Sequence, residues 1–169
     1  AILLSANRYA RFENAAIINS DVCIANSKAT KEDFLKRYLV PENWDCEVIY
    51  WGVDTEMFTI DNPINQELRN RFGCSENGIL LLAVGRLAAR KGYGSLLKAF
   101  ALVNTELPDS RLVIVGRGHL RSRLLKQADK RGISSSVFIE SSMSFLELAS
   151  LFRSADLTIY PSYYEGQGL

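Results

Sequence analysis

The stretch LLAVGRLAARKG, at positions 81–92, gives the strongest indication of fold in this chain. The apolar run 79–84 ends at Gly85, which predicts a buried strand and then a turn whose backbone can approach a neighbour closely. Arg86 offers a planar fork of donors and Lys91 a mobile point charge, a pair that suits a diphosphate. Because open α/β sheets bind ligands at the carboxyl ends of their strands, the stretch predicts an anion site. A surface turn with solvated charges is the alternative.

The sequence after Gly78 alternates between two patterns. Apolar runs that predict strands are separated by amphipathic segments that predict helices. Strands that alternate with single helices pair in parallel through right-handed crossovers, so we expect an α/β fold with a parallel sheet. The expected strands cover about 79–84, 111–115, 137–139 and 157–160. The expected helices cover about 93–104, 119–131 and a third segment capped by Ser144 and Glu147.

The sequence before Gly78 is less regular. Two strands are expected at 21–25 and 47–50, with a helix between them that stops at Pro41. A mixed helical pattern covers 4–18. The segment 54–77 contains proline, glycine and several Asn and Asp residues, which predicts a linker with a short helix.

Composition limits the possible functions. The chain has 169 residues and a net charge of +1, which argues against a surface that binds nucleic acid generally. Between positions 86 and 131, however, 11 Lys and Arg stand against 3 Asp and Glu. This excess predicts either solvated helix faces or a patch that attracts an anionic ligand or anionic lipid, so peripheral contact with a membrane is one expectation.

The three cysteines, Cys23, Cys46 and Cys74, are far apart in the sequence. They form no CxxC or His/Cys cluster, and the chain has no Asp-x-Asp, so no metal site is predicted. Cysteine usage favours a reducing compartment and no signal peptide opens the chain, so we expect a cytoplasmic location. The chain begins and ends in mid-pattern, which is typical of an internal piece of a larger protein.

The turn Gly-Arg-Gly at 116–118 follows a predicted strand and opens a predicted helix, as a dinucleotide-binding turn does. Glu140 ends the next strand, where a ribose-binding carboxylate would stand. Arg121 occupies the third glycine position, where a large side chain would hinder close packing of helix on strand. An NAD-dependent oxidoreductase, a plain tight turn and a nucleotide site of different register all stay open. His119, the single histidine, is expected to be a surface or capping residue.

The segment Glu-Gly-Gln-Gly at 165–168 closes the chain's last loop. Two glycines around one residue expose backbone N–H groups that can bind oxyanions. The carboxylate of Glu165 would face hydroxyl groups better than phosphate, because like charges repel. A sugar attached to a diphosphate satisfies both halves of this arrangement, and a surface loop with an exposed glutamate is the alternative.

Several of these segments together resemble the group 1 (family four) retaining glycosyltransferases. The donor-binding domain of that family is similar to VGRLAARKG at 84–92, LVIVGRG at 112–118 and ADLTIYPSYYEGQGL at 155–169. DVCIANS at 21–27 and VIYWGVDTEMF at 48–58 resemble the end of the family's first domain and its passage into the second. The resemblance implies a GT-B architecture of two Rossmann-like domains, each a parallel sheet with helices on both faces. The expected divisions are 1–53 for the end of the acceptor domain, 54–77 for the linker and 78–169 for the start of the donor domain.

The resemblance also implies roles for individual residues. Arg86 and Lys91 would hold the donor's diphosphate, and Glu165, the first acid of the family's E-x7-E pattern, would contact the donor sugar; these three are the expected catalytic residues. Further substrate contacts are expected from Gly85, Gly116, Gly118, Phe138, Ile139, Glu140, Gly166, Gln167 and Gly168. Two positions depart from the family: Trp51 stands where many members have Asn, and Gln167 stands where Phe is common, which bears on sugar preference.

The implied reaction is transfer of a hexose from a nucleotide-diphosphate sugar to an acceptor hydroxyl of a glycan, lipid or small molecule, with retention of configuration and without a metal or other cofactor. The second acid of E-x7-E would fall eight positions after Glu165. It is missing from this sequence, as are the family's acceptor-side residues, so the piece alone is expected to be inactive. The alternatives are an NAD-dependent oxidoreductase and a non-catalytic module that binds nucleotides or anions.

Overall fold

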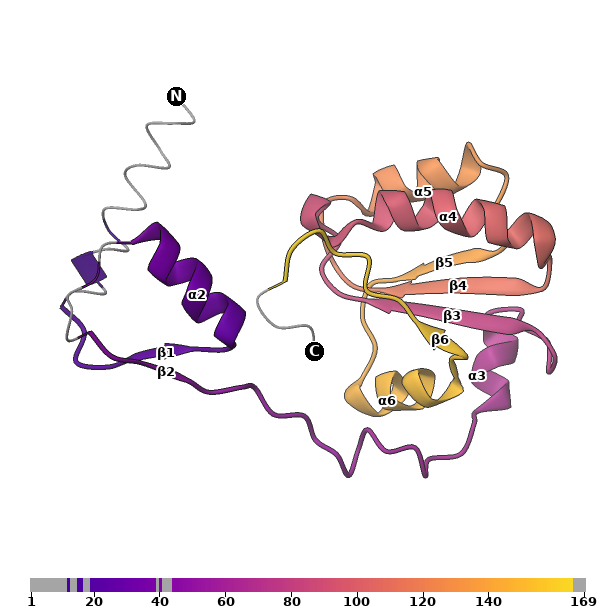
Figure 1. The fold of residues 1–169 in the computed structure, drawn as a ribbon. Helices are drawn as coiled ribbons and strands as arrows, with labels where there is room; N and C mark the ends of the chain where they lie inside the picture. The colour runs from indigo at the N-terminus through magenta and orange to yellow at the C-terminus, as the bar shows by residue number, and fades with distance from the viewer. Residues whose placement is uncertain (1–11, 13–14, 17–18, 39, 41–43, 166–169) are drawn as a thin grey trace. The chain divides into compact units, whose positions relative to one another are not determined.

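The computed structural model describes residues 12, 15–16, 19–38, 40 and 44–165 (Figure 1). The chain divides into two compact units, one formed by 1–53 with 165–169 and the other by 54–164. The helical pattern expected over 4–18 lies almost wholly outside the described residues. In the described part of the chain, no helix is long and apolar enough to span a bilayer.

The described residues of the first unit include two short parallel strands with a helix between them. β1 (Cys23–Ala25) leads through α2 (Lys28–Arg37) to β2 (Cys46–Val48). The hydroxyl of Ser27 caps α2, because it accepts a hydrogen bond from the N–H of Thr30 at 3.0 Å. Both strands overlap the ranges expected from the sequence, and the helix lies between them.

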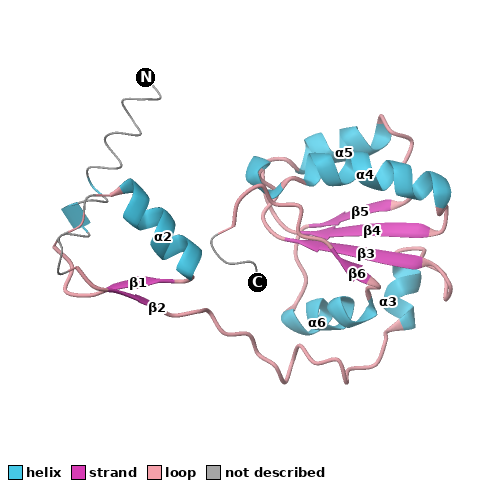
Figure 2. Cartoon of the chain, viewed as in Figure 1, coloured by secondary structure: helices cyan, strands magenta, loops and turns pink. Residues whose placement is uncertain are grey.

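The second unit is built on four parallel strands in the spatial order β5-β4-β3-β6. These strands are β3 (Ile79–Val84), β4 (Ser110–Val115), β5 (Val137–Glu140) and β6 (Leu157–Thr158). Two helices pack on each face of the sheet (Figures 1 and 2). One face carries α4 (Tyr93–Glu106) and α5 (Arg121–Asp129), and the other carries α3 (Gln66–Arg71) and α6 (Phe145–Ser154). The parallel α/β fold expected from the sequence is confirmed.

Strand β3 shows why the apolar run is uninterrupted. Leu81 and Ala83 pack under α4 and α5, whereas Leu80 and Leu82 pack against α3 and α6. Successive residues of a strand face opposite sides of a sheet, and both sides are covered here, so every position must be apolar. The segment 54–77, expected to be a linker, belongs to this unit and contains α3.

Some element ends differ from the sequence expectation. α5 begins only at Arg121, because residues 119–120 form a turn, and α4 continues to Glu106. β6 ends at Thr158, two residues before the expected end, and pairs with β3. The capping box of α6 is confirmed: the carboxylate of Glu147 accepts a hydrogen bond from the N–H of Ser144 at 3.0 Å, and the hydroxyl of Ser144 accepts one from the N–H of Glu147.

Candidate functional site

The carboxyl edge of the second unit's sheet contains the point where the strand order reverses. From β3 the chain builds outward through β4 and β5, and then returns so that β6 pairs with the other side of β3. In open α/β sheets, ligands bind in the crevice outside the carboxyl ends of the strands at such a point. The segments that leave β3 and β6, beginning at Gly85 and Ile159, therefore flank the position where a ligand is expected.

The turns after β3 and β4 are fastened to each other. The N–H of Gly85 donates to the carbonyl of Val115 at 2.9 Å, and the N–H of Leu87 donates to the carbonyl of Arg117 at 2.8 Å. A Cβ on Gly116 would lie 1.9 Å from the carbonyl oxygen of Gly85, so only glycine permits this approach. The 85–88 and 116–118 turns are thus held together at the carboxyl edge of the sheet, and Gly118 lies in the second of these turns.

Two cationic side chains, those of Lys91 and Arg86, belong to the segment that follows β3. Lys91 ends the short 3-10 turn η1 (Ala89–Lys91), and its Nζ lies 3.7 Å from the point that a Cβ on Gly85 would occupy. The hydroxyl of Tyr93 lies 3.1 Å from the same point. Arg86 is exposed, and its guanidinium makes no hydrogen bond or ion pair with any residue that the structure describes. The turn therefore presents an ammonium folded back onto the end of β3 and an exposed guanidinium beside it.

The segment that follows β6 is anchored to the same loop. The N–H of Tyr163 donates to the carbonyl of Arg90 at 2.9 Å, and the hydroxyls of Tyr163 and Ser95 lie 2.7 Å apart. Gly92 has a φ of 68°, and a Cβ there would lie 1.9 Å from the carbonyl oxygen of Pro161. Residues 161–164 are thus held against the loop that carries Lys91.

Glu165 follows this anchored segment directly in the sequence. The guanidinium of Arg90 also reaches the carbonyl of Tyr164 at 3.4 Å, so the backbone is held up to the residue before the glutamate. Gly166, Gln167 and Gly168 lie outside the described residues. The contact of Glu165 with a donor sugar stays a prediction.

The end of β5 is occupied by contacts within the protein. The ring of Phe138 packs edge-to-face on that of Phe72, with centroids 5.4 Å apart. Ile139 is buried, and its carbonyl accepts a hydrogen bond from the guanidinium of Arg121 at 3.0 Å. The carboxylate of Glu140 forms an ion pair with Arg71 at 3.3 Å. The side chains here serve the core and the surface, which leaves backbone atoms as the groups that could meet a nucleotide base.

Arg121 occupies the third glycine position of a dinucleotide turn, where a large side chain is expected to hinder close packing of helix on strand. Its guanidinium donates a hydrogen bond to the carbonyl of Ile139 at 3.0 Å and ties the start of α5 to β5. The helix still packs on the sheet through the buried Leu124 and Ala128. His119 is exposed in the turn that precedes α5.

The electrostatic character of the edge is positive. Arg86, Arg90 and Lys91 follow β3, and Arg117 follows β4, where it donates to the hydroxyl of Ser142 at 2.9 Å. Cations gathered at one edge attract anionic ligands. Partial burial raises the pKa of the phenol of Tyr160, which follows β6, so this group stays neutral at physiological pH. Across the described residues, no group of three or more His, Cys, Asp and Glu side chains could hold a metal ion.

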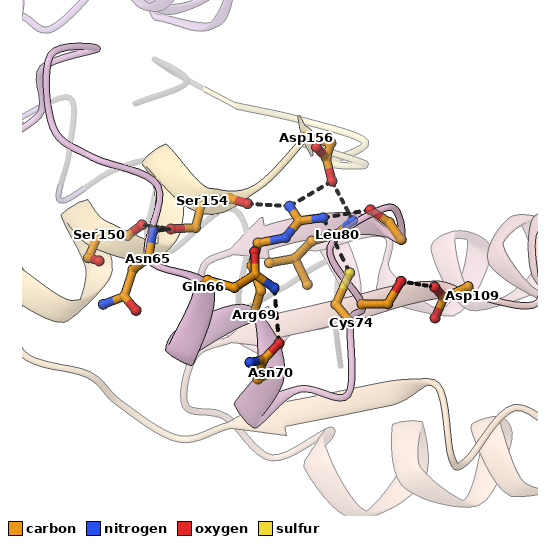
Figure 3. A network of polar contacts seen from close by, with 12 residues as sticks. Asn65, Gln66, Arg69, Asn70, Cys74, Leu80, Asp109, Ser150, Ser154 and Asp156 are labelled. Atoms are coloured by element: carbon orange, nitrogen blue, oxygen red, sulfur yellow. Dashed lines mark hydrogen bonds and ion pairs between the residues drawn. The ribbon is translucent and has the colours of Figure 1, made fainter.

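The opposite, amino edge of the sheet holds a different arginine (Figure 3). Arg69 of α3 is 4% exposed. Its guanidinium donates to the carbonyl of Ser154 at 2.8 Å, to the carboxylate of Asp156 at 3.0 Å and to the carbonyl of Gly78 at 2.5 Å. Asp156 also accepts from the N–H of Leu80 at 2.7 Å. This network joins α3, β3 and the α6–β6 connection, and no sequence pattern indicated it.

A groove of about 530 Å³ lies between the segment 56–67 and α6. Its walls combine apolar side chains with two acids, Glu56 and Glu67. None of the residues that line it belongs to the site expected from the sequence.

The description of a known family fits most of the second unit. The family model "Glycosyl transferases group 1" matches residues 64–169. The chain belongs to this family. The resemblance seen in the sequence is therefore confirmed, and the fold is that of the GT-B glycosyltransferases.

Individual relatives agree with this assignment. The chain is 32% identical over 168 residues to a D-inositol 3-phosphate glycosyltransferase of Thermobifida fusca, covering 94% of this chain and 38% of that protein. It is 30% identical over 148 residues to an uncharacterised glycosyltransferase of Methanocaldococcus jannaschii, covering 86% and 37%. The crystal structure of WaaG, a glycosyltransferase involved in lipopolysaccharide biosynthesis, superimposes with a TM-score of 0.79 at 26% identity, covering 94% and 43%. The chain thus spans about two-fifths of the length of these relatives.

Proposed function

We propose that the protein containing this chain transfers a hexose from a nucleotide-diphosphate sugar to an acceptor hydroxyl, with retention of anomeric configuration. The observation that carries the proposal is a convergence at the point where the strand order reverses. Arg86 and Lys91 stand on one side of that point, and the anchored segment 161–164, which leads to Glu165, stands on the other.

The chemistry of a glycosyl donor suits this arrangement. Breaking the bond between sugar and diphosphate leaves negative charge on the diphosphate and positive character on the sugar. Arg86 and Lys91 would stabilise the leaving group as preorganised donors, and each charge-assisted hydrogen bond contributes about 1.5–3 kcal/mol. Glu165 would face the hydroxyl groups of the sugar. The proposal includes no cofactor.

The names of relatives support a nucleotide-sugar donor. HepE of Anabaena, which shares this fold at a TM-score of 0.76 and 22% identity, was crystallised with UDP-glucose. A relative of Mycolicibacterium smegmatis, 30% identical over 118 residues, is named a GDP-mannose-dependent mannosyltransferase. UDP- and GDP-hexoses are therefore the donors to test, with glycan, lipid and small-molecule hydroxyls as acceptors. The cationic edge fits peripheral contact with an anionic membrane that carries a lipid acceptor.

The proposal is tested by removing each cation from the intact protein. Arg86→Met and Lys91→Met should each lower kcat by about 10²–10³ with the preferred donor, because a transition-state donor is lost. Lys98→Met and Arg123→Met are matched controls, since both residues are exposed on helices α4 and α5. The controls should keep wild-type turnover. Near wild-type turnover in the Arg86 or Lys91 variant would remove that residue from the mechanism.

Three further measurements distinguish the remaining functions. NMR of the product should show the anomeric configuration of the donor, and an inverted product would exclude the retaining reaction. Titration with NAD(H) tests the oxidoreductase alternative, which the ion pair between Glu140 and Arg71 already makes less suitable. Binding of RNA or anionic vesicles without any donor-sugar binding would favour a non-catalytic module.

A further inference from the structure

Two of the three cysteines are register partners in the first unit. Cys23 of β1 lies directly beside Cys46 of β2 in the parallel pair, and both are free thiols. Neighbouring strands are about 4.8 Å apart, and side chains of register partners leave the same face of a sheet. A disulfide needs Cα atoms roughly 4.4–6.8 Å apart, and the usual spacing of neighbouring strands falls within that range.

The pairing register places the two thiols on the same face of the strand pair. The thiol of Cys46 lies 3.7 Å from the carbonyl oxygen of Glu47. Burial first, and then the interaction with Cys46, raises the pKa of the Cys23 thiol. The two thiols are therefore neighbours on one face of the strand pair, one partly buried and the other buried.

The two cysteines differ in access. Cys46 is buried, at 3% exposure, whereas Cys23 is only partly buried. A reagent from solvent can therefore reach Cys23 before it reaches Cys46, the register partner of Cys23. Cys74 provides a contrast within the same chain: it is 1% exposed, lies in the second unit, and is held beside the guanidinium of Arg69 at 3.5 Å.

We propose that Cys23 and Cys46 form a redox-active dithiol that closes to a disulfide when a low-molecular-weight disulfide reaches Cys23. The thiolate of Cys23 attacks one sulfur of the reagent, forms a mixed disulfide and releases one thiol. The thiolate of Cys46 then attacks the Cys23 sulfur, forms the Cys23–Cys46 bond and releases the second thiol. The two cysteine protons end on the two released thiols, and two electrons pass from the cysteines to the reagent.

The bridge would close a loop that contains α2. Residues 23 and 46 enclose this helix, and the ammonium of Lys31 on α2 already donates to the carbonyl of Cys46. A cross-link of this kind restricts the unfolded chain more than the folded one. The oxidised protein should therefore unfold at a higher temperature than the reduced protein, through the first unit.

The test uses oxidised glutathione as the reagent. The intact native protein is incubated with it, quenched in acid, unfolded and labelled with N-ethylmaleimide, and its peptides are then analysed by mass spectrometry. We expect a cross-linked pair of peptides that contain Cys23 and Cys46, with Cys74 labelled in every sample. If Cys23 and Cys46 are labelled as fully as Cys74 after oxidation, the proposal is wrong, and this comparison needs no substituted protein.

Two variants test the order of attack. Cys46→Ser should retain glutathione on Cys23, because no second thiol can release it. Cys23→Ser should leave Cys46 reduced, because the remaining thiol is buried. Glutathione on Cys46 in the second variant, or none on Cys23 in the first, would overturn the assigned roles.

Discussion

Arg69 and Arg86 stand at opposite edges of the same sheet, and they differ in how the fold uses their donors. The side chain of Arg69 is 5% exposed and bonds to two carbonyls and the carboxylate of Asp156. Arg86 is exposed, and its guanidinium has no polar partner among the described residues. Positive charge therefore does not identify a binding site in this molecule. The proposed site instead rests on an exposed guanidinium at the edge where the strand order reverses.

The amino-edge network explains why a charge is tolerated there. A buried cation is retained only when nearby groups satisfy its donors, because desolvation costs several kcal/mol. The carbonyls of Gly78 and Ser154 end up beside Arg69 because α3 packs across the starts of β3 and β6. Arg69 therefore holds α3 against the starts of β3 and β6, whereas the guanidinium of Arg86 makes no comparable contact with the described residues.

The largest expected effect would come from removing the buried arginine. Arg69→Met keeps the length of the side chain but leaves two carbonyls and Asp156 without their donor. Each buried acceptor that loses its partner costs about 1–3 kcal/mol, so unfolding in urea should show a loss of about 3–5 kcal/mol.

Arg86→Met is the matched control for this comparison. It removes the same charge from an exposed position and should change the free energy of unfolding by less than about 0.5 kcal/mol. Equal losses in the two variants would abolish the distinction between the two edges.

A second, smaller effect concerns the backbone of the carboxyl edge. Gly92 and Gly132 have nearly the same φ, 68° and 69°, but only Gly92 faces another chain segment, with Pro161 O 1.9 Å from an added Cβ. Gly132→Ala should lower the free energy of unfolding by about 1–2 kcal/mol, because alanine disfavours the left-handed conformation. Gly92→Ala should lower the free energy of unfolding by about 1–3 kcal/mol more than Gly132→Ala does, because the segment after β6 must also move.

Urea unfolding of both alanine variants measures this difference directly. Equal losses would show that the segment 161–164 is not fixed by its approach to Gly92. A larger loss for Gly92→Ala, together with weaker donor binding, would show that backbone contact holds this side of the site.

The smallest effect concerns a charge that is neither buried nor at the site. Hydrogen bonds from the backbone and side chain of Ser144 lower the pKa of Glu147, and its charge also favours the start of α6. A lowered folded pKa gives stability that is complete above the unfolded value, near 4.5, and is lost as pH falls through the folded value.

Thermal unfolding of Glu147→Gln between neutral pH and about pH 3 tests this dependence. The wild type should have the higher midpoint at neutral pH, and the difference should disappear in acid, because glutamine keeps a capping hydrogen bond without the charge. A difference that stays constant with pH would contradict the assignment.

Local patterns made much of the fold predictable from sequence. The apolar run before Gly85, the capping residues of α6 and the glycine at 116 each act on neighbours within a few residues. Their consequences are fixed by backbone geometry and burial, so the parallel α/β fold and the turns at its edge follow from them.

Contacts between distant residues were not predictable in the same way. Arg69 meets Ser154 across 85 positions, and Tyr163 meets Ser95 across 68. Cys23 and Cys46 are neighbours only because two strands pair in one register. A surface residue and a buried one of the same type look alike in sequence, because burial is decided by packing that no local pattern records.

The contacts around Lys91 have a consequence for how this edge can move. Tyr163 is bonded to the carbonyl of the preceding residue, and Pro161 lies against the glycine that follows. The backbone of Lys91 is therefore held on both sides by the segment that leaves β6, so a displacement of residues 161–163 would also displace Lys91. In the proposed donor site, ligand contacts to Lys91 and ligand contacts to the segment after β6 would therefore be coupled.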